Sequence, residues 1–100
     1  MSDITGSANV SGVTLTYDVN PTAETATVVA SYDGVKLGSA TLTSSDVSAT
    51  IGGSVAGTTV KVTVTANWTS DTITYSVKLD TPLTKAKTYG GTLVHWSASN

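Results

Sequence analysis

Strict alternation of apolar and polar side chains is the feature that most limits how this chain can fold. Between residues 59 and 68 every second side chain is apolar, at Val60, Val62, Val64, Ala66 and Trp68. Successive side chains of a β-strand point to opposite faces, so the pattern predicts a strand with one buried and one solvated face. Most of the intervening residues are threonine, whose β-branched side chain favours extended backbone. Strong helix formers are scarce, with one Glu and neither Gln nor Arg.

Similar short apolar and alternating segments recur along the chain. They predict six further strands, at residues 13–19, 25–32, 35–43, 47–51, 72–79 and 92–97. Asp33-Gly34 suits the positive φ angles of a type I′ turn and therefore predicts a tight hairpin. The apolar phase shifts at Gly38-Ser39, where we expect a β-bulge. Residues 80–89 contain Pro82 and no clear period, and we expect them to form the longest loop.

Seven short strands separated by turn residues predict an all-β fold. The expected architecture is a two-sheet antiparallel β-sandwich of about seven strands, immunoglobulin-like or jelly-roll, with a small barrel as the alternative. One hundred residues fit a single domain, 1–100. No internal repeat suggests a solenoid.

Charge and composition exclude several classes of partner. The net charge is −2, and the five lysines are scattered along the chain. A nucleic-acid surface needs clustered cations, so we expect no nucleic-acid partner. No apolar run is long enough to cross a bilayer, and the first residues do not resemble a signal peptide. The chain has no cysteine, so its stability depends on core packing and strand pairing, and the compartment stays open.

The residues that usually carry catalysis or bind metals are few. His95 is the one imidazole, and Ser54 lies in a Gly-rich segment that lacks the spacing of a nucleophile elbow. Most aspartates fit predicted turns and strand ends, namely Asp33, Asp46, Asp71 and Asp80. We therefore expect no catalytic residues and no enzymatic activity. One His without Cys excludes the usual zinc sites, and no metal site or cofactor is predicted, although turn carboxylates leave calcium open.

The aromatic residues suggest a ligand site at the strand ends. Trp68 stands beside Asn67 and close to Asp71, and Trp96 stands beside His95. Sugar rings stack on aromatic faces, and their hydroxyls bind short amide and carboxylate groups. These five residues are the candidate ligand-binding set. The alternative is that both Trp side chains are core, because each continues the apolar phase of its strand.

Two functions follow from this reasoning. The first is a non-enzymatic, lectin-like module that binds glycans, with Trp stacking on the sugar. The second is a structural or adhesive immunoglobulin-like module of a surface, phage or fibre assembly, whose edge strands would serve in assembly. Both are compatible with a homo-oligomer, because multivalency raises the avidity of weak sites.

Overall fold

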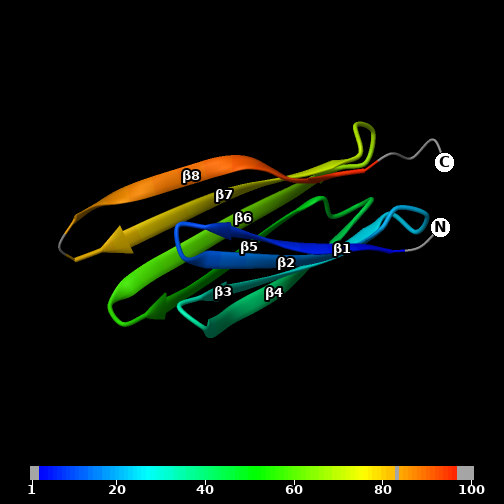
Figure 1. Ribbon diagram of the computed structural model, residues 1–100. Helices are drawn as coiled ribbons and strands as arrows, with labels where there is room; N and C mark the ends of the chain where they lie inside the picture. Colours follow the sequence, from blue (N-terminus) through cyan, green and yellow to red (C-terminus); the bar gives the residue numbers. More distant parts are fainter. Residues whose placement is uncertain (1–2, 83, 97–100) are drawn as a thin grey trace.

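The computed structural model describes residues 3–82 and 84–96, and these form eight β-strands and no helix (Figure 1). The strands are β1 (Ile4–Val10), β2 (Val13–Asn20), β3 (Thr25–Tyr32), β4 (Val35–Thr43), β5 (Ser48–Val55), β6 (Thr58–Asn67), β7 (Thr72–Thr81) and β8 (Thr84–His95). Among these residues no helix is long and apolar enough to span a membrane.

The strands form two antiparallel sheets of four, which confirms the all-β, two-sheet prediction. Sheet A has the order β1-β2-β3-β4 and sheet B the order β5-β6-β7-β8. Within each sheet every connection joins hydrogen-bonded neighbours, so both sheets are meanders. Immunoglobulin-like and jelly-roll domains contain Greek-key crossovers instead, so the expected immunoglobulin-like or jelly-roll topology is wrong. The described strands number eight, against the expected seven or so. The two sheets are separate, so the described strands do not form the alternative barrel.

A single cluster of buried apolar side chains, drawn from both sheets, forms the core. It is built mainly from alternating positions of the central strands β2, β3, β6 and β7, and β4 and β5 add Leu42 and Ile51. Its fully buried members include Val13, Leu15, Val19, Val28, Ala30, Leu42, Val60, Val62, Val64, Ile73 and Val77. The alternation seen in the sequence is therefore the inside–outside pattern of the two sheets.

Most predicted strands are confirmed. The Asp33-Gly34 turn has positive φ at both residues, as a type I′ hairpin requires. The register of β3 and β4 shifts at the predicted region of β4, where Ala30 faces Gly38 and Ser31 faces Lys36. The extra residue is Leu37, one position before the predicted Gly38-Ser39.

Three segments differ from the predictions. The predicted strand 47–51 begins one residue later and continues through Gly52-Gly53 to Val55. β1 was not predicted, because its inward positions include the small residues Gly6 and Ala8, which give a weak apolar signal. The predicted loop at residues 80–89 is wrong: β7 continues to Thr81 and β8 begins at Thr84. As a result the predicted strand 92–97 is the last part of a longer one, and its final residue lies outside the described residues.

The two sheets repeat the same turns. The β1–β2 and β5–β6 hairpins turn on Ser11-Gly12 and Ala56-Gly57, with positive φ at all four residues. The β2–β3 and β6–β7 turns each follow an Asn and end on an acidic residue with positive φ, Glu24 (54°) and Asp71 (58°). Each sheet is thus a version of one four-stranded unit.

The connections define two ends of the molecule. At one end, the Trp end, lie the start of β1, the β2–β3, β4–β5 and β6–β7 connections and the end of β8. At the other, the hairpin end, lie the β1–β2, β3–β4, β5–β6 and β7–β8 turns. The molecule is elongated, with Cα extents of 48 × 21 × 20 Å. At the hairpin end, β7 and β8 extend beyond sheet A (Figure 1).

Candidate functional site

Trp68 and Trp96 meet at the Trp end and pack against the core. Their ring centroids lie 5.6 Å apart with a tilt of 53°, an ordinary geometry for an aromatic pair. Trp96 is buried, with 5% of its surface exposed, while Trp68 is half-buried. The Trp68 indole Nε1 donates a 3.0 Å hydrogen bond to the Thr43 carbonyl oxygen of sheet A. The pair therefore joins the two sheets at this end, and little of the Trp96 ring is available for stacking.

Asn67 and Asp71 form the turn that carries Trp68. The Asn67 Oδ1 accepts hydrogen bonds from the backbone N–H groups of Thr69 (3.1 Å) and Ser70 (3.0 Å). Asp71 is the residue of this turn with positive φ, and its backbone carbonyl oxygen accepts a 3.0 Å hydrogen bond from the backbone N–H of Trp96.

The corresponding turn of sheet A uses the same chemistry. The Asn20 Oδ1 accepts the Ala23 N–H at 3.1 Å, and Glu24 has positive φ. Because an Asn and an acidic residue recur in a turn that carries no Trp, turn formation explains why Asn67 and Asp71 are present.

His95 and Asn67 lie on the other side of sheet B from the Trp pair. Asn67 faces Thr72 across β6 and β7, and Thr72 faces His95 across β7 and β8. All three belong to the outer face, whereas Trp96 turns into the core. The structure thus brings Trp68 and Trp96 together, but it places Asn67 and His95 on the opposite face of sheet B and Asp71 in the turn between β6 and β7.

The outer faces of both sheets are rich in hydroxyl side chains, in rows interrupted at Asp18, Val29 and Gly90. On sheet B one cross-strand row is Ser48, Thr65, Thr74 and Thr92, and the next is Thr50, Thr63, Ser76 and Gly90. Neighbouring hydroxyls approach each other across the strands, with Ser48 Oγ to Thr65 Oγ1 at 3.3 Å and Thr50 Oγ1 to Thr63 Oγ1 at 3.4 Å. On sheet A the equivalent rows are Thr5, Asp18, Thr27 and Thr41, and Ser7, Thr16, Val29 and Ser39.

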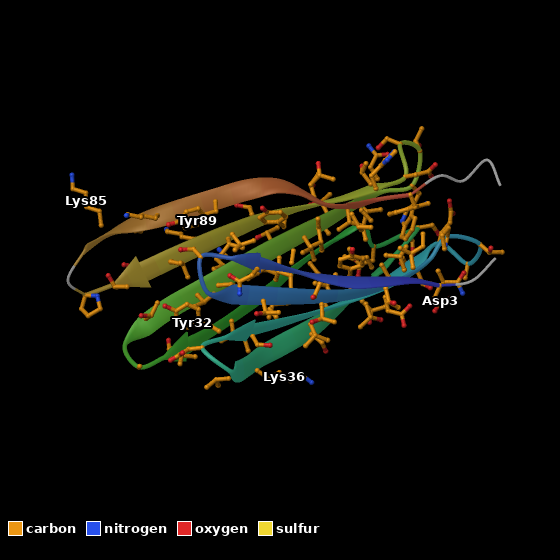
Figure 2. All side chains as sticks on the ribbon, in the orientation of Figure 1. Asp3, Tyr32, Lys36, Lys85 and Tyr89 are labelled. Carbon is orange, nitrogen blue, oxygen red and sulfur yellow. The ribbon has the colours of Figure 1, made fainter. Side chains whose placement is uncertain are left out.

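Charged side chains are unevenly distributed along the molecule. Five of the seven acidic residues belong to the Trp end or the adjacent strand halves, namely Asp3, Asp18, Glu24, Asp46 and Asp71. All five lysines lie in strand halves nearer the hairpin end, namely Lys36, Lys61, Lys78, Lys85 and Lys87. Figure 2 shows Asp3 and Lys85 at opposite ends.

Like charges are neighbours within each half. A hydrogen bond to the Asp3 side chain is the main cause that raises the pKa of Asp18 above its usual 3.8, with smaller contributions from desolvation and from the charge of Asp3. In the other half, Lys61 and Lys78 face each other directly across β6 and β7. Like charges in this position destabilise a sheet.

This uneven charge distribution was missed from the sequence, where the lysines look scattered. It becomes visible once each strand is given a direction, because alternate strands run opposite ways and bring distant residues to the same end.

The part of the chain that the structure describes encloses no pocket, and its residues form no cluster of three His, Cys, Asp or Glu able to hold a metal ion. Its features are surfaces: two outer faces rich in hydroxyl side chains, two ends, and the edge strands β1, β4, β5 and β8. Comparison with family models, with curated proteins and with solved structures gave no match.

Proposed function

We propose that this protein is a structural or adhesive module that works through its surfaces in a larger assembly. The proposal rests on the contacts of the candidate ligand-binding residues. The Trp pair, Asn67 and Asp71 all make contacts that hold the fold together. A rod with one continuous core and hydroxyl-covered flanks is suited to passive display or packing. The sandwich is here of a two-meander kind rather than the expected Greek-key kind.

The exposed edges give this module places to assemble. Each sheet has two edge strands, β1 and β4 in sheet A and β5 and β8 in sheet B, and each of these pairs with a strand on one side only, which leaves a row of backbone groups for a partner. On the side of β1 and β8, the Ser11 Oγ donates a 3.4 Å hydrogen bond to the Tyr89 hydroxyl and so links the two sheets.

Sedimentation velocity across a wide concentration range tests the proposal. Reversible association of the folded chain, without any small-molecule ligand, is the expected result. A strict monomer that instead binds a soluble ligand in a stoichiometric complex would contradict it.

Glycan binding is the second candidate. Its supporting observation is that Trp68 is half-buried and follows Asn67, whose outer row also contains the half-buried Thr72 and the exposed His95. In this proposal the accessible part of the Trp68 ring contacts the sugar, and Asn67 and His95 bind its hydroxyls from the outer face.

A glycan array, read with and without calcium, tests this candidate. Binding to a related set of sugars that free sugar competes away would support it, and loss on chelation would add a metal. His95→Ala is the informative variant, because His95 is exposed and its loss should weaken sugar binding while leaving the unfolding midpoint unchanged. No binding by folded protein would count against it.

A further inference from the structure

The two ends of β4 carry complementary surfaces. At its start, at the hairpin end, Val35 and Lys36 are both exposed, and at its far end the connection to β5 presents the exposed Asp46 and Val47. Val35 (49%) and Val47 (39%) are the large hydrophobic side chains that are exposed in the described part of the chain. Each exposed valine therefore has a charged neighbour in sequence, a lysine at one end and an aspartate at the other.

The Asp46–Val47 surface is held in place before any partner arrives. The Thr43 N–H donates to the Asp46 carbonyl oxygen at 2.9 Å, and the Asp46 N–H donates to Thr43 Oγ1 at 3.0 Å. The Val47 carbonyl oxygen accepts the Ala66 N–H at 2.7 Å. A surface that is already ordered loses less conformational entropy on binding.

The distribution of charge along the whole molecule also favours contact between the unlike ends of two copies. The half at the Trp end carries five of the seven acidic residues and no lysine, while the half at the hairpin end carries all five lysines against Asp33 and Asp80. Each half also contains a pair of neighbouring like charges, Asp3 with Asp18 and Lys61 with Lys78. Docking the acidic end on a basic end would reduce the repulsion within both.

We propose that this protein associates head to tail with a second copy of itself, the Val35–Lys36 surface of one copy contacting the Asp46–Val47 surface of the next. The inference rests on the proposed structural function and names its partner and its geometry. The two contacting surfaces differ, so the contact is heterologous: each copy leaves one surface free for the next, and the copies add in a row or, if the rotation between them closes, in a ring.

The association is expected to be weak and sensitive to salt. The ends are small, since the Cα extents across the rod are only 21 and 20 Å. A stable interface usually buries about 800 Å² per partner, and exposed charges are screened beyond about 8 Å at physiological ionic strength. Stable rows therefore need high local concentration or low salt.

Charge reversal gives the first test, by sedimentation velocity at low salt. Lys36→Glu makes both ends of β4 acidic and Asp46→Lys makes both basic, so each variant alone should associate about five- to tenfold more weakly than the original chain. Mixing the two variants should restore association, because the Asp46→Lys copy keeps Lys36 and the Lys36→Glu copy keeps Asp46. The matched control, Thr50→Glu/Ser76→Glu, gives the same net charge as Lys36→Glu on the outer face of sheet B and should associate like the original chain.

Cysteine cross-linking gives the second test, since the chain has no cysteine of its own. A mixture of Val35→Cys and Val47→Cys chains under mild oxidation should form the mixed disulfide much faster than either homodimer. Circular dichroism of each variant establishes that it is folded.

The outcomes separate the two levels of the proposal. Equal loss of association in the control, no recovery on mixing, or preferred Val35→Cys homodimers would overturn the head-to-tail geometry. The chain could still associate in those cases through pairing of edge strands, which salt does not weaken. The proposed structural function would then stand, and only the head-to-tail geometry would be wrong. A monomer at every concentration and salt overturns the head-to-tail inference, and ligand binding by that monomer would overturn the structural function as well.

Discussion

At the scale of single residues, the same side chains that suggest a ligand site turn out to have structural partners. Trp96 is buried, Trp68 bonds to the Thr43 carbonyl, and Asn67 accepts two backbone N–H groups. The sequence places these residues at a strand end correctly. It cannot say which face each side chain takes, because the apolar phase of Trp68 fits core and ligand contact equally well.

The Trp pair gives the first prediction, on stability. Trp96→Ala should lower the free energy of unfolding by about 3–5 kcal/mol, because it removes a buried aromatic ring from the core. Trp68→Phe keeps most of the packing and loses one hydrogen bond, which corresponds to about 1 kcal/mol. Urea denaturation measures both. His95→Ala is the control, expected within about 0.5 kcal/mol of the original chain, and an equally small effect of Trp96→Ala would show that the ring is not core.

Asp18 gives a prediction on pH dependence. Its pKa is raised in the folded state, so the folded chain holds this proton more tightly than the unfolded chain. The stability that the protonated group contributes is full below its usual pKa of 3.8 and is lost as the pH rises through the raised value. Asp18→Asn should therefore raise the urea midpoint near neutral pH, and the gain should disappear in acid. A gain that is the same in acid would mean that charge is not its cause.

At the scale of elements, prediction from sequence succeeds where one face of a strand is buried and fails where it is not. β6 and β7 are central and were predicted almost to their ends. The sequence predicts a loop for the first part of β8 because this part extends beyond sheet A, so the exposed Lys85, Ala86, Lys87 and Thr88 show no inside–outside period. β1 was missed because Gly6 leaves room for the Tyr17 ring, which a Cβ at that position would meet. The Tyr ring, not the edge strand, carries the apolar signal there.

The paired hairpin turns give a prediction at this scale. Ala56 has a φ of 51° in the β5–β6 turn, a left-handed conformation that costs an ordinary residue about 1–2 kcal/mol. Asn tolerates this conformation, and Asn-Gly is a preferred type I′ sequence. Ala56→Asn should therefore stabilise the fold by about 1 kcal/mol in a thermal or urea titration. Gly57→Ala should destabilise it, and stabilisation by Gly57→Ala would mean that the turn is not of this type.

At the scale of the whole molecule, the separation of charge affects the stability of the monomer as well as its association. Like charges are close neighbours within each half, while most opposite charges lie in different halves. Salt therefore screens more repulsion than attraction. The melting temperature of dilute protein should rise modestly between low and physiological ionic strength, while association weakens. A melting temperature that falls with added salt would indicate that attractive pairs dominate.

The placement of the first and last strands also determines how the protein would respond to mechanical force. β1 begins and β8 ends at the Trp end, and each is the edge of a different sheet (Figure 1). Tension between the two ends of the chain would peel β1 from β2 and β8 from β7 one hydrogen bond at a time, instead of shearing whole strands at once. Such a unit would therefore open at a lower force than one whose terminal strands are sheared along their whole length.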